Sequence, residues 1–208
     1  AGEALPRLAI IVGLVDVRRV VAEEVPVDRE VRGTLPMRRG VDERDPAALG
    51  QDPIVYLRTE LGVIVVQVQQ DRAPQTAANF LKYVDAGLYD GTTFHRAVTP
   101  ANQPTDPVKI EVIQGGEIPP DQCFPPVPLE RTSVTGLKHV NGAMSMARDA
   151  VDSATSSFFI CLGDQPQLDF GGRRHKDGQG FAVFGRVVQG MDKALWIQQS
   201  PCQGQLLS

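Results

Sequence analysis

Short apolar segments separated by turn residues dominate the chain from residue 54 onward. Ile54 to Thr59 and Val63 to Val68 are rich in β-branched residues, and a short loop that contains Gly62 separates them. Two such runs joined by a short glycine-containing loop predict a β-hairpin. Further strands are expected at residues 92–96, 110–113, 157–162 and 181–188, and in the phrase AMSMA.

Two other segments repeat their apolar positions with helical spacing. Between Ala77 and Val84 the apolar side chains recur every three or four residues, and Gly87 follows where a helix C-cap is expected. A second, shorter helix is expected at residues 191–199. Many short strands with only two helices favour a mainly β domain, built as a closed or sandwiched sheet.

Residues 1–52 differ in character from the rest of the chain. Runs of valine and isoleucine are mixed there with dense charge, and the alternation around residues 13–20 indicates a strand. Residues 38–53 are polar and contain Gly and Pro, so we expect a linker or surface loop. We therefore divide the chain into an N-terminal extension over residues 1–52, made of a strand plus linker, and a main domain over residues 53–208.

Composition narrows the classes of function. The 208 residues are 42% hydrophobic and 22% charged, which is ordinary for a globular chain, and a net charge of -4 argues against a broad face for nucleic acid. No apolar run reaches the roughly 20 residues needed to span a bilayer, so no membrane span is expected. Cys123, Cys161 and Cys202 lie far apart without a CxxC pair, which excludes a disulfide scaffold and a cysteine-rich metal site.

Five phrases between Val55 and Pro201 occur in a recognisable order. They are APQTAANFLKYVDAGLYDGTTFHR, VIQGG, GLKHVNGAMSMAR, SATSSFFICLGDQPQLD and FAVFGRVVQGMD. In these residues the chain resembles the cyclophilin family of peptidyl-prolyl cis/trans isomerases, with a bacterial character. The resemblance implies a closed eight-stranded antiparallel barrel with two capping helices. Its interior would be packed with side chains, and substrate would bind in a groove on the outer face.

The implied reaction is rotation about an X–Pro bond in a polypeptide. Amide resonance gives this bond a barrier of roughly 18–20 kcal/mol, and rotation breaks no bond, so no cofactor and no metal is expected. In the twisted state the prolyl nitrogen regains a lone pair, which a fixed arginine can stabilise by donating a hydrogen bond. Arg96 matches the family's catalytic arginine, and Gln114 matches the glutamine that orients it and touches substrate. By themselves, the two would be a surface arginine at a strand end and a turn residue before two glycines.

The resemblance also assigns the walls of a proline pocket. Phe159 and Leu168 match two apolar walls, although an apolar residue in a strand is more often an ordinary core residue. Val112 stands where the family usually has methionine and gives a shorter apolar wall. Phe181 stands where bacterial members have tyrosine, so it would keep an aromatic wall without a polar tip.

Backbone groups near residue 148 complete the implied substrate site. The family uses backbone groups at the positions of Ala147, Arg148 and Asp149 to hold the substrate chain extended. This role depends little on the side chain, so Arg148 in place of the usual asparagine need not abolish it. His95 is expected to be structural, because isomerisation needs no proton shuttle, and the other two histidines are expected to be solvated or locally hydrogen-bonded.

One departure from the family pattern bears directly on catalysis. Three residues before Gln114 the family has a phenylalanine that forms a pocket wall, and here that position is Glu111. A carboxylate buried at an apolar pocket would be costly. Glu111 could instead point to solvent, pair with Arg96 and weaken catalysis, or reflect a register shifted by the longer loop at residues 99–109.

Two further departures thin the substrate site. Ser157 replaces a glutamine that faces substrate, so one long donor and acceptor is lost. Gln167 replaces the aromatic residue that, in the family, helps to bind the cyclic peptide inhibitor cyclosporin. We therefore expect weak cyclosporin binding and an isomerase activity below that of efficient family members.

The strand that closes the barrel is displaced in the sequence. Family barrels close with a last strand that follows the second helix and pairs with the first strand, but this chain ends at Ser208 before such a strand. The phrase GLVDVRRV at residues 13–20 resembles that closing strand. We hypothesise that residues 13–20 supply it by pairing with residues 54–59, in the same chain or exchanged with a neighbour.

Three functions remain as hypotheses at this level. The first is an isomerase that assists folding of Pro-containing polypeptides. The second is a cyclophilin-fold module that binds Pro-containing segments with little or no turnover. The third is a scaffold whose charged N-terminal region docks a partner. The bacterial character and the start at Ala1 favour a periplasmic or exported location, with a cytoplasmic one left open.

Overall fold

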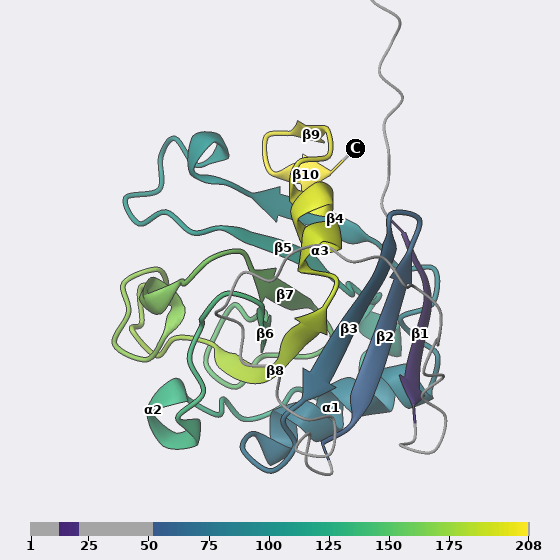
Figure 1. The fold of residues 1–208 in the computed structure, drawn as a ribbon. Coiled ribbons are helices and arrows are strands. Elements are labelled where there is room, and N and C mark those ends of the chain that lie inside the picture. The colour runs from purple at the N-terminus through teal and green to yellow at the C-terminus, as the bar shows by residue number, and fades with distance from the viewer. Residues whose placement is uncertain (1–12, 21–51, 208) are drawn as a thin grey trace, which may run out of the picture.

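One ten-stranded antiparallel sheet dominates the computed structural model, which describes residues 13–20 and 52–207 (Figure 1). Its strands follow the order β1-β2-β3-β8-β6-β7-β5-β4-β10-β9, and the prediction of a mainly β chain is confirmed. The strands are β1 (Leu14–Val20), β2 (Ile54–Thr59), β3 (Gly62–Val68), β4 (Phe94–Val98), β5 (Val112–Gly115), β6 (Ala143–Met146), β7 (Phe158–Cys161), β8 (Ala182–Gln189), β9 (Cys202–Gln203) and β10 (Leu206–Leu207).

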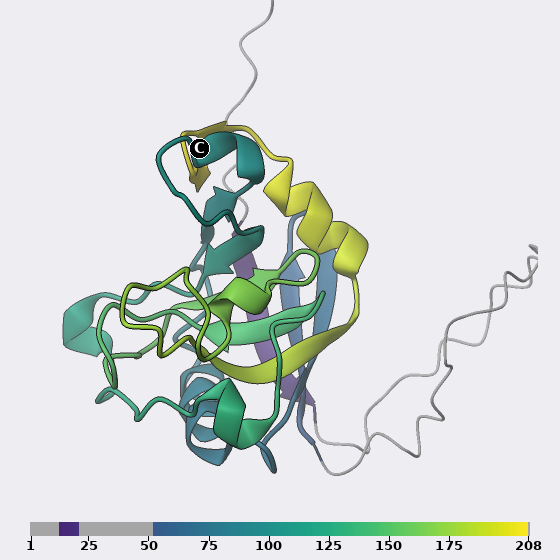
Figure 2. The ribbon, with the colours of Figure 1, turned by 90° about the vertical axis from the view of Figure 1, so that its left-hand side faces the viewer.

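The two predicted helices lie at opposite ends of this sheet. Helix α1 packs against β1 and β8, and α3 packs against β3, β4 and β5 (Figures 1 and 2). Pro74 suits the first turn of α1, where its missing N–H costs nothing, and Gly87 (φ +66°) follows the C-cap in the left-handed conformation that glycine adopts easily. The helices are α1 (Pro74–Asp85), the short α2 (Thr132–Thr135) and α3 (Met191–Gln198), with 3₁₀ turns at Pro100–Asn102, Pro120–Gln122 and Pro166–Leu168.

Strand β1 occupies the place of the displaced closing strand. It pairs antiparallel with β2 within the same chain, with Val17 opposite Leu57, which confirms the hypothesised pairing of residues 13–20 with residues 54–59. Leu14 and Val17 are fully buried, so β1 contributes to the core. Residues 13–20 thus belong to the sheet of the main domain, while most of the predicted linker at residues 38–53 lies outside the described residues.

The sheet differs from the expected closed eight-stranded barrel, because it has ten strands and no continuous ladder joins β1 to β4. Between the starts of β1 and β4 the chain forms an isolated bridge, from Gly13 to Thr93, and hydrogen bonds between Leu14 and residues 91 and 92, instead of a continuous ladder. The β9–β10 hairpin pairs with β4 instead, and Leu206 lies opposite Arg96. The hairpin therefore brings residues near the end of the chain next to the predicted catalytic arginine.

Aromatic side chains fill the interior, as the resemblance implied. Phe80 of α1 lies 5.7 Å from Phe158 and 5.0 Å from Phe184 between ring centroids, and Tyr89 lies 5.5 Å from Phe158. All four residues are fully buried, and each stabilises the fold by about 1.5–3 kcal/mol through removal of apolar surface from water. With its interior filled, the sheet can bind a ligand on its outer face but not inside.

Candidate active site

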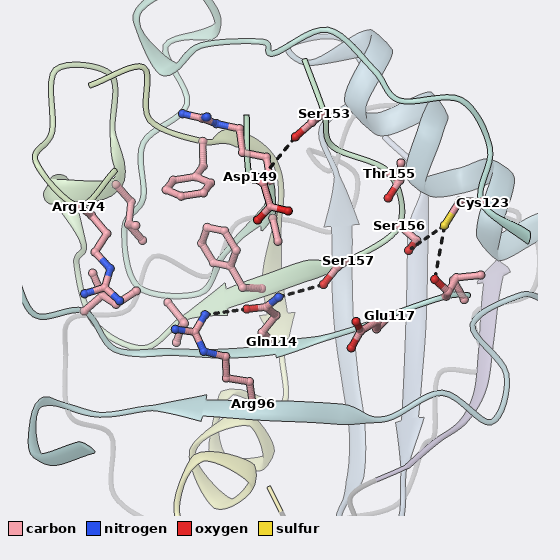
Figure 3. A pocket seen from close by; sticks show the side chains of 18 of the residues that line it. Arg96, Gln114, Glu117, Cys123, Asp149, Ser153, Thr155, Ser156, Ser157 and Arg174 are labelled. Carbon is pink, nitrogen blue, oxygen red and sulfur yellow. Dashed lines mark hydrogen bonds between the residues drawn. The ribbon is translucent and has the colours of Figure 1, made fainter. Parts of the chain in front are cut away.

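A cavity of about 560 Å³ opens over strands β4, β5 and β7 (Figure 3). Arg96 lies opposite Gln114 across the β4–β5 ladder, and Gln114 lies opposite Phe159 across the β5–β7 ladder. Directly opposed residues share a face of a sheet, so all three side chains point to the same side. The register of β4 shifts between Phe94 and Arg96, which turns Arg96 toward the cavity while Phe94 stays in the core.

The structure gathers most of the predicted site residues around this cavity. The exceptions are Glu111 and Gln167, which do not line it. Ile110, which the sequence did not single out, supplies an apolar wall instead. The predicted residues that do line the cavity are Arg96, Val112, Gln114, Ala147, Arg148, Ser157, Phe159, Leu168 and Phe181.

Strand alternation places Glu111, predicted as a substrate-binding residue, outside the lining of this cavity. Val112 and Gln114 point into the cavity, so residues at odd positions point to the other side of β5. The Glu111 side chain lines a separate cavity of about 420 Å³, beside Met191 and Leu195 of α3. Among the described residues Arg96 has no ion pair, so Glu111 does not neutralise it.

Gln167 is also directed elsewhere. Its Nε2 donates hydrogen bonds to the carbonyl oxygen of Lys109, at 2.6 Å, and to Oε1 of Gln165, at 2.9 Å. The side chain therefore fastens the 3₁₀ turn at Pro166–Leu168 to the end of the loop at residues 99–109 and leaves the wall of the cavity to Leu168.

Neutral acceptors hold the Arg96 guanidinium on two sides. Nε and Nη2 donate to Oε1 of Gln205, at 2.9 and 2.6 Å, and Nη1 donates to Oε1 of Gln114, at 3.0 Å. Burial lowers the pKa of Arg96, and the nearby Arg174 cation lowers it further, but an arginine remains charged at neutral pH. A guanidinium has five N–H groups. Three of them donate to the described residues, so two are left for a ligand.

Gln205 is a functional contact that the sequence did not reveal. It lies in the β9–β10 hairpin, and its own carbonyl oxygen accepts a hydrogen bond of 2.8 Å from the backbone N–H of Ala97. Its side-chain Nε2 donates to the carbonyl oxygen of Asn102, at 3.2 Å. The hairpin is thereby fixed to β4, and Gln205 supports Arg96 from the side away from Gln114.

Ser157 takes part in the same chain of hydrogen bonds. Nε2 of Gln114 donates to Oγ of Ser157, at 3.1 Å (Figure 3). This hydroxyl donates to the carbonyl oxygen of Gly115, at 3.3 Å. The hydrogen bond that Gln114 donates to Ser157 fixes the Gln114 amide with its oxygen toward Arg96. Ser157 therefore orients Gln114. Its side chain is too short to extend across the cavity as the longer glutamine of the family would.

A buried histidine supports the aromatic wall of the cavity. The His139 ring stacks on Phe159, with centroids 5.9 Å apart, and Phe159 meets Phe181 edge-on at 5.5 Å. Nδ1 of His139 lies 2.8 Å from Asp169, and Nε2 lies 3.0 Å from Oγ of Ser145. The expectation of local hydrogen bonding is confirmed for His139, which fixes the ring behind the pocket.

This histidine gives stability a dependence on pH. Burial lowers the pKa of His139, although the hydrogen bond to Asp169 opposes the shift. The unfolded chain, with a histidine pKa of about 6.5, therefore binds a proton that the folded state excludes. We expect the free energy of unfolding to be highest above this pH value and to decrease as the pH falls below it. Burial also lowers the pKa of His95, which adds a decrease in the same direction.

Urea denaturation at pH 7.5 and pH 5.5 measures this effect. In His139→Gln, whose side chain does not titrate, we expect a smaller difference between the two midpoints than in the wild type, with the remainder due to His95. Equal differences in the two proteins would contradict the assignment.

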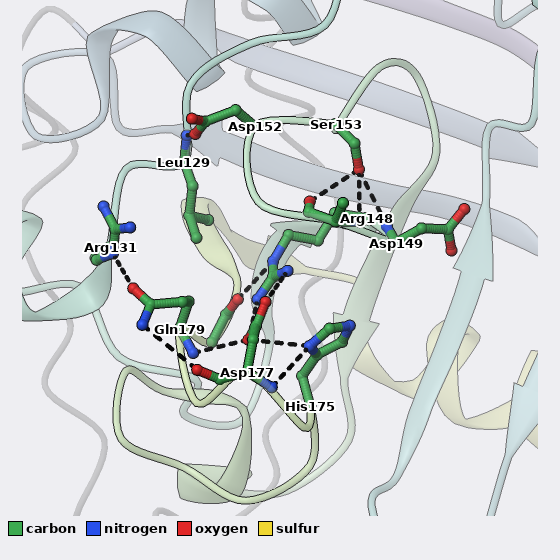
Figure 4. Close-up of polar contacts among 11 residues, drawn as sticks. Leu129, Arg131, Arg148, Asp149, Asp152, Ser153, His175, Asp177 and Gln179 are labelled. Carbon is green, nitrogen blue, oxygen red and sulfur yellow. Dashed lines mark hydrogen bonds and ion pairs between the residues drawn. The ribbon is translucent and has the colours of Figure 1, made fainter.

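The Arg148 side chain organises a loop beside the cavity. Nη1 and Nη2 bind Asp177 at 2.8 and 2.9 Å, and Nε donates to the carbonyl oxygen of Gly180 at 2.8 Å (Figure 4). The guanidinium also lies over the Phe181 ring, 5.1 Å from its centroid. Hydrogen bonds from Arg148 hold the pKa of Asp177 well below its usual range. The pair fixes the segment that leads from Leu168 to Phe181.

Charged groups also line the two ends of the cavity. Glu117 lies at one end and Arg174 at the other, with Asp149 on the rim between them (Figure 3). Nε2 of His95 lies 3.7 Å from Glu117, outside the set of lining residues. In the part of the chain that the structure describes, no cluster of His, Cys, Asp and Glu could hold a metal ion. The described helices are also too short or too polar to cross a membrane.

Comparison with known proteins places this site in context. Residues 54–206 match the family described as "Cyclophilin type peptidyl-prolyl cis-trans isomerase/CLD". The chain is 38% identical over 148 residues to "Peptidyl-prolyl cis-trans isomerase A" of Dickeya dadantii, covering 70% of each protein. It is 37% identical over 142 residues to "Peptidyl-prolyl cis-trans isomerase B" of Escherichia coli, covering 67% of this chain and 80% of that protein.

A solved structure supports the fold independently. It is a cyclophilin type peptidyl-prolyl cis-trans isomerase of Cryptosporidium parvum, crystallised in the presence of the dipeptide Ala-Pro. The TM-score is 0.56 at 20% identity, and the match covers 73% of this chain and 90% of that chain. The arrangement of the sheet and its helices is therefore shared with that structure.

Proposed function

The chain belongs to the cyclophilin-type peptidyl-prolyl cis-trans isomerases, and we propose that it turns over X–Pro bonds by holding the twisted amide between Arg96 and an apolar wall. The observation that carries this proposal is the guanidinium of Arg96, held over the cavity by two neutral amides. Two of its N–H groups are left for substrate, and its charge is not neutralised by a carboxylate of the described chain.

The geometry suits the electronic change during rotation. As the X–Pro amide twists, resonance is lost and the prolyl nitrogen regains a lone pair, which accepts a hydrogen bond far better than the planar amide nitrogen does. Because Gln114 and Gln205 fix the guanidinium beforehand, little reorganisation is needed when the twisted state forms. The stabilisation is therefore larger for the twisted amide than for either planar isomer.

The apolar wall supplies the second requirement. Val112, Phe159 and Leu168 are nearly buried and line the cavity beside Arg96, with Phe181 next to Phe159. A proline ring placed against them loses contact with water, which anchors one side of the rotating bond while the other side turns. The exclusion of water also strengthens the hydrogen bond from Arg96.

Proline-limited refolding of a test protein, or exchange of a Suc-Ala-Ala-Pro-Phe peptide, tests the proposal. We expect the wild-type protein to accelerate exchange above the uncatalysed rate, which corresponds to roughly 10–100 s per event. Binding of the peptide without acceleration would identify the chain as a module that holds Pro-containing segments, and the isomerase proposal would be abandoned.

We also propose that cyclosporin binds weakly. Gln167 stands at the position where the family has an aromatic residue for this inhibitor, and its side chain is bonded to Lys109 and Gln165 away from the cavity. Calorimetry is expected to show micromolar or weaker affinity for the wild type and a tighter complex for Gln167→Trp. Nanomolar affinity of the wild type would refute the proposal.

A further inference from the structure

Arg174 is the second cation of the cavity, and nothing in the proposed rotation step uses it. It lies in the loop between β7 and β8, and only 13% of its side chain is exposed. Its Nη1 donates to Oε1 of Gln103 at 3.0 Å and to the carbonyl oxygen of Val108 at 2.7 Å, and it lies 3.3 Å from Asp106. The loop at residues 99–109 thus holds this guanidinium in place through one nitrogen.

The other two nitrogens of Arg174 donate no hydrogen bond to a described residue. Both hydrogen bonds from its guanidinium to the described residues, and its closest approach to Asp106, involve Nη1, so within the described part of the chain the N–H groups of Nε and Nη2 have no hydrogen-bond acceptor. Neither Nε nor Nη2 of Arg174 is fully shielded from solvent, and Arg174 lines the cavity. A ligand in the cavity can therefore reach both nitrogens. Nearly buried donors that lack an acceptor favour a ligand that supplies one.

The charges around Arg174 favour binding of a negatively charged group of a ligand. Burial lowers the pKa of Arg96 most, repulsion from the nearby Arg174 lowers it further, and Asp106 opposes the shift. Both residues that hold Arg96 are neutral amides. Arg148, the third arginine of the cavity, is already paired with Asp177. Asp106 neutralises Arg174 only in part, because its carboxylate is 39% exposed and such pairs are screened by water.

The opposite end of the cavity has the opposite sign. Glu117 lines that end, Asp149 lines the rim between the two ends, both residues are exposed, and Figure 3 shows Glu117 across the cavity from Arg174. A bound peptide therefore meets a positive field on one side of its proline and a negative field on the other. An acidic side chain is attracted to the Arg174 end and repelled from the Glu117 end.

We propose that Arg174 is a specificity residue that binds the carboxylate of an Asp or Glu next to the substrate proline. The inference rests on the proposed function, because it takes the cavity as the place where a Pro-containing chain lies. The planar fork of Nε and Nη2 matches the two oxygens of a carboxylate, which forms charge-assisted hydrogen bonds with it. A neighbouring residue lies about 3.8 Å along the chain from the proline, so its side chain stays within the same cavity.

Matched peptides test this directly. Acetylated and amidated peptides carry Glu or Gln immediately before the proline in one pair, and immediately after it in another, so that the chain ends are uncharged. For each pair we measure kcat/KM by exchange and Kd by NMR titration, at 20 mM and 300 mM salt. We expect the Glu peptide of one pair to be favoured about 10-fold in both quantities at low salt, and less at high salt, because screening shortens the reach of the charge.

Two variants assign the preference to one side chain. In Arg174→Gln the ratio between Glu and Gln peptides is expected to fall to about one, while Arg173→Gln removes an exposed charge from the neighbouring position and is expected to keep the wild-type ratio. A wild-type ratio of one in both pairs, or a preference that survives in Arg174→Gln, would overturn the inference. Loss of exchange for all peptides would count against the isomerase proposal alone, because the Kd ratios still report on Arg174.

Discussion

Replacing Arg96 with alanine is expected to lower kcat/KM for X–Pro exchange by roughly 10²–10³-fold, the range found when one preorganised donor to a transition state is removed. The contacts of Arg96 explain the size of this effect. Its guanidinium is held by Gln114 and Gln205 and forms no ion pair with a carboxylate of the described residues, so its remaining N–H groups can act on the twisted amide. Arg96→Lys is expected to recover only part of the rate, because a single ammonium nitrogen lacks the planar fork that spans both amides and the substrate nitrogen.

The same exchange assay on Gln205 separates position from charge. In Gln205→Ala the guanidinium loses two of its three hydrogen bonds, so we expect an intermediate loss of kcat with a smaller change in KM. In Gln205→Glu the bonds can remain, but a carboxylate now faces the cation and weakens its effect on the prolyl nitrogen. Unfolding midpoints of both variants control for damage to the hairpin. Full activity in Arg96→Ala would contradict the proposal that Arg96 stabilises the twisted amide.

Replacing Leu14 with alanine is expected to lower the free energy of unfolding by about 2–5 kcal/mol, the range for loss of a large apolar side chain from a packed core. Leu14 is fully buried, and its backbone N–H donates to the carbonyl oxygen of Thr92 at 2.6 Å. The residue therefore joins β1 to both the core and the segment before β4. Urea denaturation of the two proteins measures the difference.

Arg19→Ala is the matched control in the same strand. Arg19 is exposed, and its only ion pair among the described residues is a 3.9 Å contact with Asp85. Its removal is expected to change stability by less than about 0.5 kcal/mol. If Leu14→Ala were equally mild, β1 would not contribute to the core in solution, and the main domain would be stable without residues 13–20.

Much of the fold could be predicted because it is encoded locally. The hairpin of β2 and β3 follows from two β-branched runs around Gly62, and α1 follows from apolar spacing that ends before Gly87. The strands predicted at residues 92–96 and 110–113 were each displaced by two residues from β4 and β5, because strand ends depend on partners distant in the sequence. The phrases that include Arg96 and Gln114 sufficed to predict that these two residues belong to one site.

The sequence by itself determined a mainly β chain, the positions of its two main helices, and the arginine and glutamine of the site, because each depends on nearby residues or on a phrase shared with a family. Only the tertiary structure decided that Glu111 points away from Arg96, since the face of a strand depends on register. Only it showed Gln205 and Arg174 beside Arg96, because the β9–β10 hairpin and the loops at residues 99–109 and 169–181 meet in space. Contacts of this kind join residues about 70 to 110 positions apart, and no local pattern in the chain records them.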